Sequence, residues 1–148
     1  MTDSFLQMWA ELLPVGRSAS SGGYRRFAWN SADAECRAWF EQQARSRGLT
    51  YELDRNGNQW AWLGDPQGEG AVVTGSHLDS VPDGGAYDGP LGVVSSFAAL
   101  DELRSRGAEF TKPLAIVHSC ATPTASGCPT RWSGPATTRP RSARTTTG

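Results

Sequence analysis

Residues 75–93, GSHLDSVPDGGAYDGPLGV, combine a histidine with several carboxylates and glycines in one short stretch. His77 and Asp79 are two positions apart, so in an extended backbone their side chains point to the same side. Asp88 follows a glycine-rich turn, and Gly89 after it permits a close approach of the backbone. An imidazole with carboxylates suits a divalent ion of the zinc type, and one carboxylate can bridge a pair of ions. The stretch therefore indicates part of a metal site.

The same residues also permit a simpler interpretation. A His-x-Asp pair is often only a surface hydrogen bond, and glycines and aspartates in a loop often serve only the geometry of turns. One imidazole supplies only part of a typical zinc ligand set. Residue type and spacing alone leave both interpretations open.

The elements around this stretch predict an α/β domain. Residues 70–76, GAVVTGS, and 113–118, PLAIVH, are apolar and rich in β-branched residues, which predicts two buried strands. A helix that begins near Leu91 and ends at Gly107 connects them and makes a parallel crossover. Functional groups gather at the carboxyl ends of such strands, and His77 directly follows the first one. The predicted apolar face of this helix consists of Val93, Val94, Phe97, Leu100 and Leu103.

The first half of the chain predicts two further helices. Residues 4–13 carry apolar residues at helical spacing, and Pro14 ends the pattern. A second helix begins at Asn30 or Ser31 and stops at Gly48. Its predicted buried stripe consists of Cys36, Trp39, Phe40 and Ala44.

A loop and a hairpin complete the predicted elements. Residues 16–24, GRSASSGGY, are typical of a flexible loop. Residues 49–54 and 59–64 flank the pair Asn56-Gly57, which is a strong signal for a hairpin with a two-residue turn.

Length and composition indicate a single folded domain. The chain has 148 residues, of which 38% are hydrophobic, and no apolar run is long enough to span a membrane. The three cysteines are odd in number and never spaced as C-x-x-C, which favours a reducing compartment. We therefore expect a cytoplasmic protein, with neither a nucleic acid nor a membrane as a partner.

The stretch GSHLDSVPDGGAYDGPLGV closely resembles the first metal-binding motif of the zinc-dependent amidohydrolases related to aminoacylases and carboxypeptidases. The closest resemblance is to the branch that contains allantoate amidohydrolase, N-carbamoyl-L-amino-acid hydrolase and β-ureidopropionase. It extends to LPVGR, GGYRRFAWNSADAECRAWFEQQARSRGL, DRNGNQWAWLGD and LDELRSRGAEFTKPLAIV. It thus covers roughly residues 5–117, which would be the first quarter or third of such an enzyme.

This resemblance implies a zinc-exopeptidase-like catalytic domain with a mixed sheet and flanking helices, of which residues 1–118 would be the N-terminal portion. It implies two divalent ions, zinc or manganese, with His77 as a ligand of one ion and Asp88 as a bridge between both. Asp79 would be the carboxylate that orients His77 and supports catalysis. The implied reaction is metal-dependent hydrolysis of a linear amide, ureido or amidine C–N bond, in a small substrate such as an N-carbamoyl amino acid or allantoate. Intact members of the family form homodimers.

Beyond residue 118 the resemblance ends. The family pattern continues with a Glu-Glu-Gly motif, whose first glutamate is the general base and whose second is a metal ligand. Here the chain reads HSCATPTASGCPTRW, and no acidic residue follows Glu109. We expect His118 to be an ordinary packed residue rather than a substitute ligand. The chain is therefore expected to be a truncated and inactive fragment.

The composition of the last segment is unlike the rest. Residues 121–148 hold four arginines, eight threonines and four prolines, but no acidic residue and no Leu, Ile or Val. Such a composition predicts a disordered tail over residues 119–148, because little apolar surface is available to offset the entropy of ordering. A shift of reading frame in a GC-rich gene would explain the missing acids, the missing aliphatics and the end of the resemblance together. A genuine disordered tail is the alternative.

Two other functions stay open at this point. A metallopeptidase fragment of the same superfamily would share the metal chemistry but not the resemblance before residue 70. A non-catalytic remnant that binds a metal or a partner would need none of the missing residues.

Overall fold

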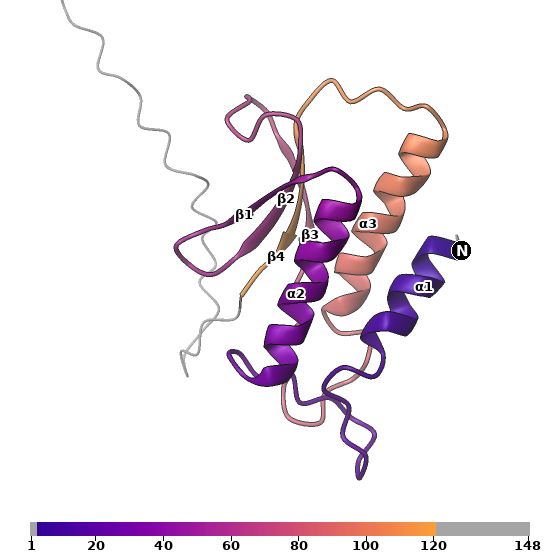
Figure 1. Ribbon diagram of the computed structural model, residues 1–148, viewed down its shortest axis with the longest axis vertical. Helices are drawn as coiled ribbons and strands as arrows, with labels where there is room; N and C mark the ends of the chain where they lie inside the picture. The colour runs from indigo at the N-terminus through magenta and orange to yellow at the C-terminus, as the bar shows by residue number, and fades with distance from the viewer. Residues whose placement is uncertain (1–2, 121–148) are drawn as a thin grey trace, which may run out of the picture.

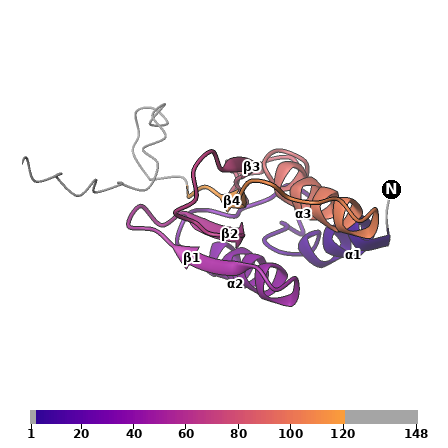
Figure 2. The same cartoon turned by 90° about the horizontal axis from the view of Figure 1, so that it is seen from above.

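The computed structural model describes residues 3–120. They form a mixed sheet with helices packed against one of its faces, as Figures 1 and 2 show. The helices are α1 (Asp3–Leu12), α2 (Ser31–Ser46) and α3 (Pro90–Ser105). The strands are β1 (Thr50–Leu53), β2 (Gln59–Leu63), β3 (Val72–Ser76) and β4 (Leu114–His118). The α/β fold class with a mixed sheet and flanking helices is confirmed.

The strands lie in the order β1-β2-β4-β3. β1 and β4 are antiparallel to β2, whereas β3 is parallel to β4. α3 connects β3 to β4, so the predicted parallel crossover is present. Ser76 at the end of β3 pairs with His118 at the end of β4. His77 therefore begins its loop at the carboxyl edge of two parallel strands.

The main core lies between the sheet and the helices. Successive residues of a strand point to opposite faces, so Ala61 and Ile116 face the helices and join this core. On the opposite face Trp60 and Trp62 stack with ring centroids 5.7 Å apart. The predicted stripe of α2 is confirmed, because Cys36, Trp39, Phe40 and Ala44 are all buried.

Both long helices begin and end where the sequence predicts. The side chain of Asn30 accepts a hydrogen bond from the backbone nitrogen of Asp33, which caps α2. Pro90 occupies the first turn of α3. The predicted face of α3 is wrong at one position, because Leu103 is 43% exposed. A helix turns by about 100° per residue, so Leu103 points roughly 80° away from Val93.

The strand predicted at residues 70–76 is present as β3, but the prediction that it is buried is wrong. β3 lies at the edge of the sheet formed by the described residues, with Val72 52% and Val73 36% exposed. A short apolar run predicts a strand but not which strands pair with it. The same run can therefore lie in the centre of a sheet or at its edge.

The hairpin of β1 and β2 is present, but its turn is longer than the predicted two residues. Leu53 pairs with Gln59, and the backbone nitrogen of Asp54 donates to the carbonyl of Asn58. The Asp54 carboxylate accepts hydrogen bonds from the backbone nitrogens of Asn56 and Asn58. These bonds stabilise the longer turn, since an aspartate that bonds the following backbone favours a turn of its own.

Residues 16–24, for which we expected a flexible loop, form hydrogen-bonded turns, and Tyr24 makes backbone bridges to Arg17 and Gly84. No helix among residues 3–120 is long and apolar enough to cross a membrane. The predicted disordered tail lies outside the described residues from position 121 onward. Ser119 and Cys120 are described, and their backbone nitrogens donate to the Ser76 carbonyl and to Asn58 Oδ1.

Candidate metal centre

The imidazole of His77 is oriented by Asp79. Nδ1 of His77 lies 3.1 Å from Oδ1 of Asp79 and 3.1 Å from the Asp79 carbonyl oxygen. Both oxygens accept hydrogen bonds, so Nδ1 carries the proton and donates it. The lone pair on Nε2 is therefore available to bind a metal ion.

Asp88 lies on the Nε2 side of the same ring. Its Oδ1 is 3.9 Å from His77 Nε2, and its side chain is 78% exposed. Gly89 makes this approach possible, because its φ is +84° and an added Cβ would lie 2.6 Å from His77 Cε1. The structure thus brings together the three residues that the sequence singled out.

Three contacts hold the loop between β3 and α3 against the body. Leu78 is fully buried in the main core. The backbone nitrogen of Ser80 donates to the Arg26 carbonyl at 2.9 Å, and the Arg26 nitrogen donates to Ser80 Oγ at 3.0 Å. Tyr24 and Gly84 exchange a pair of backbone hydrogen bonds. His77 and Asp79 flank the buried Leu78, so their positions follow from core packing.

The electrostatics of the pair favour an ionised Asp79 carboxylate that holds the proton on the imidazole. The hydrogen bond to Asp79 raises the pKa of His77 above its ordinary value, although partial burial acts in the opposite direction. Burial acts to raise the pKa of Asp79, but the hydrogen bond and the charge of His77 outweigh it, so this pKa lies below its ordinary value. Asp79 therefore stays ionised near neutral pH and keeps the proton on Nδ1.

His118 is separate from this group. It is 1% exposed, and its ring lies 5.9 Å from that of Phe40. Gln59 donates through Nε2 to the Arg37 carbonyl and to Tyr51 Oη, so its Oε1 is left to accept from His118 Nδ1 at 2.8 Å. The expectation of a packed histidine is confirmed.

The donor set fits a metal ion only in part. The free lone pair of His77 Nε2 and the exposed carboxylate of Asp88 are the types of ligand that zinc and manganese accept. Within residues 3–120, no three His, Cys, Asp or Glu side chains gather closely enough to form a complete ligand group. The described residues therefore supply two donor groups of a suitable type, which is fewer than a zinc site commonly has.

The sequence analysis missed the residues that support the loop. Arg26 is 2% exposed, and its guanidinium donates to the carbonyls of Leu12 and Val15. Its neighbour Arg25 instead forms an exposed ion pair with Asp83. No local pattern distinguishes the two arginines, because the difference arises from long-range contacts.

Comparison with known proteins identifies relatives of this chain. No protein-family model matches the chain. A protein of Mycolicibacterium smegmatis named as a hydrolase is 40% identical over 100 residues, which are 68% of this chain and 23% of that protein. The allantoate amidohydrolase of Bacillus subtilis is 33% identical over 110 residues, which are 74% of this chain and 26% of the relative.

A solved structure shares both the sequence and the fold. The hydantoinase/carbamoylase family amidase of Burkholderia ambifaria superposes with a TM-score of 0.71 and 33% identity, over 78% of this chain and 29% of that one. The homologues and structural neighbours of this chain are thus amidohydrolases of this family. The chain spans about a quarter of the length of the curated relatives named above.

Proposed function

We propose that this chain contributes part of the metal centre of an enzyme that hydrolyses a linear amide, ureido or amidine C–N bond. The observation that carries the proposal is the placement of His77 between Asp79 on Nδ1 and Asp88 near Nε2. The names of relatives support the substrate class, since they include allantoate amidohydrolase and N-carbamoyl-L-amino acid amidohydrolase. N-Carbamoyl amino acids and allantoate are therefore the substrates to test.

Each residue of the proposed centre has a distinct part. His77 Nε2 would bind one ion, and the two carboxylate oxygens of Asp88 could bind two ions. Asp79 fixes the orientation of His77 and the proton on its Nδ1. Two zinc or manganese ions held there would lower the pKa of a bound water from about 16 to near 7 and polarise the scissile carbonyl.

We expect the 148-residue chain by itself to lack hydrolase activity. A catalytic zinc is commonly held by about three protein ligands, whereas His77 and Asp88 provide two ligating side chains. Three glutamates that are conceivable as a replacement base lie elsewhere: Glu52 in β1, Glu69 in a turn and Glu102 in α3. Loss of a general base alone costs about 10²- to 10⁴-fold in rate.

Metal titration of the purified chain tests the proposed centre. We expect Mn²⁺, followed by electron paramagnetic resonance, to bind the wild-type chain and to bind Asp88→Asn and His77→Ala more weakly. Asp83→Asn is the matched control, because Asp83 lies in the same loop but pairs with Arg25 on the surface. Equal Mn²⁺ affinity in all four proteins would contradict the proposal.

Turnover assays separate the candidate functions. The chain and the full-length Bacillus subtilis relative are compared on allantoate, N-carbamoyl amino acids and dipeptides with added Mn²⁺ or Zn²⁺. Turnover by the chain within about tenfold of the relative would refute the expected inactivity, since it exceeds what the loss of a base allows. Metal binding without turnover would agree with a chain that holds only part of the centre.

A further inference from the structure

Three aromatic rings stack across the boundary between α1 and the loop that carries Asp88. Phe5 and Trp9, one helical turn apart in α1, have ring centroids 6.0 Å apart and nearly parallel planes. Tyr87 continues the stack, with its centroid 5.2 Å from that of Trp9 and an angle of 12° between the planes. Tyr87 is 67% exposed, so burial in the core does not account for its position.

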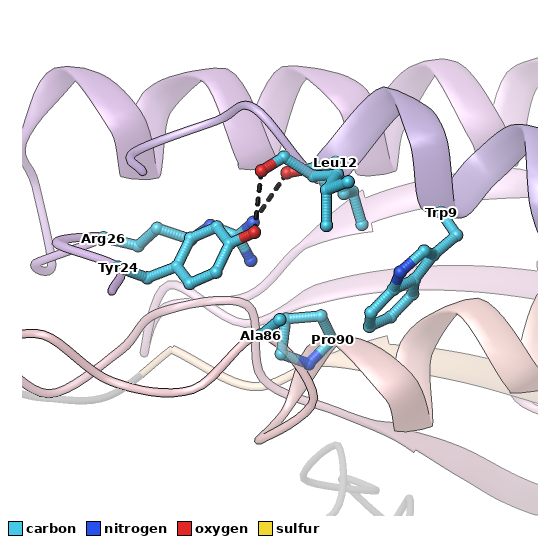
Figure 3. Close-up of a pocket in the computed structure, with 7 residues that line it drawn as sticks. Trp9, Leu12, Tyr24, Arg26, Ala86 and Pro90 are labelled. Carbon is cyan, nitrogen blue, oxygen red and sulfur yellow. Dashed lines mark hydrogen bonds between the residues drawn. The ribbon is translucent and has the colours of Figure 1, made fainter. Parts of the chain in front are cut away.

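The helix that presents Trp9 is itself fixed at its carboxyl end. The buried Arg26 donates to the carbonyls of Leu12 and Val15 at 2.7 and 2.9 Å, and Tyr24 Oη donates to the Leu13 carbonyl at 2.7 Å. The Leu12 carbonyl also accepts from the backbone nitrogen of Val15, so these bonds reinforce the turn that ends α1. Figure 3 shows Arg26 and Tyr24 reaching the end of α1 at Leu12.

The face of α1 that carries Trp9 also packs against the start of α3. Trp9, Ala86 and Pro90 line a small pocket between the two segments (Figure 3). Trp9 therefore offers a fixed surface on which the ring of Tyr87 rests.

Asp88 lies between two constrained neighbours. On one side Tyr87 stacks on Trp9, and on the other the backbone of Gly89 packs against His77. Among the described residues, the His77 imidazole is the one ionic partner that the structure gives the Asp88 carboxylate. This single contact, at 3.9 Å, does little to fix the Asp88 carboxylate. Its position therefore depends on the backbone on either side.

We propose that Tyr87 is a positioning residue, whose stack on Trp9 holds the Asp88 backbone so that the carboxylate stays beside His77 Nε2. The consequence for metal affinity rests on the proposed function, because it requires Asp88 to be a ligand. The effect of the stack on the backbone of residues 86–92 does not depend on the proposed function.

Metal affinity provides the first test. Tyr87→Ala should weaken Mn²⁺ binding about two- to tenfold, the equilibrium equivalent of one aromatic pair. Tyr87→Phe keeps the ring and should bind as the wild type does. Trp9→Leu removes the other half of the stack and should weaken binding by a similar factor. Val81→Ala is the control, because Val81 lies in the same loop and is 66% exposed.

Hydrogen exchange of the metal-free chain provides an independent test. The backbone nitrogens of Leu91 and Gly92 donate to the carbonyls of Tyr87 and Gly89. Both amides should exchange faster in Tyr87→Ala and Trp9→Leu than in the wild type, while Tyr87→Phe and Val81→Ala should leave them unchanged. The melting temperature of Tyr87→Ala should stay close to that of the wild type, because the ring is mostly exposed.

The two measurements separate the possible failures. Should the wild-type chain bind no Mn²⁺, the proposed function fails, and hydrogen exchange alone decides the role of Tyr87. Unchanged exchange at Leu91 and Gly92 in Tyr87→Ala overturns the inference whatever the metal does. Equal losses of affinity in Tyr87→Ala and Val81→Ala also overturn it, because they would indicate a general loosening of the loop.

Discussion

The Asp79 carboxylate lies 3.1 Å from Nδ1 of His77, on the side of the ring opposite to the edge that faces Asp88. A carboxylate in this position determines which nitrogen carries the proton and how the ring is turned. If His77 binds a metal ion, Asp79 controls the affinity without touching the ion.

Replacement of Asp79 should therefore weaken metal binding. We expect Asp79→Asn to lower Mn²⁺ affinity about 10- to 100-fold, the range found when the partner of a ligating histidine is changed. Mn²⁺ titration of Asp79→Asn beside Asp83→Asn measures the effect, because both changes remove one negative charge from the loop. An equal, small loss in the two variants would mean that only the net charge of the loop matters.

Gly89 should tolerate no side chain. Its φ of +84° disfavours other residues, and an added Cβ would lie 2.5 Å from the His77 carbonyl oxygen. We expect Gly89→Ala to lower the free energy of unfolding by about 2–5 kcal/mol, from backbone strain together with the clash. Urea denaturation measures this loss. Gly85→Ala is the control, because an added Cβ at Gly85 meets nothing within 4 Å, and a comparable loss there would refute the explanation.

Two adjacent acidic residues in α3 should differ in their contribution to stability. Asp101 accepts hydrogen bonds from Arg47 Nε and Nη2, both at 2.8 Å, and from Ser4 Oγ at 2.7 Å, in a partly buried position. Asp101→Asn should lower the free energy of unfolding by about 1–3 kcal/mol.

The neighbouring Glu102 is the comparison for Asp101. It pairs with Arg106 one turn along the same helix, on the exposed surface. Glu102→Gln should change the free energy of unfolding by no more than about 0.5 kcal/mol. Urea denaturation of both variants gives the difference directly, and equal losses would show that the contacts of Arg47 add nothing to stability.

Stability should fall in mild acid because of His118. Burial, with a smaller effect of the Arg37 charge, lowers the pKa of His118 from 6.5 to about 4. Between these values the unfolded chain binds a proton that the folded protein excludes. The contribution is therefore complete above pH 6.5 and is lost as the pH falls toward 4, by at most about 3 kcal/mol.

The free energy of unfolding measured between pH 4 and 8 tests this dependence. His118→Gln removes the titrating group, so its curve should be flatter than that of the wild type between pH 4 and 6.5, even if its overall stability is lower. Curves of identical slope would assign the pH dependence to other groups.

Local sequence was sufficient to predict the elements of this fold. The limits of α2 follow from Asn30 and Gly48, whose effects on a helix act within one turn. The crossover from β3 through α3 to β4 follows from one helical pattern between two apolar runs. The errors at Leu103 and at β3 concern which side of an element is covered, and this depends on neighbours that a local pattern does not specify. The turn of the hairpin and the loop at residues 16–24 also differ from the prediction, because hydrogen bonds of Asp54 and of Tyr24 shape them.

The sequence by itself determined that His77 and Asp79 share one side of an extended segment, because the two-residue period of a strand fixes it. Its resemblance to a family also singled out Asp88. Only the tertiary structure decided that Asp88 returns to the Nε2 edge of His77 and that Tyr87 rests on Trp9. Trp9 and Tyr87 are far apart along the chain, so their contact requires α1, α3 and the loop to pack together. Such packing depends on the whole core, and no pattern of neighbouring residues encodes it.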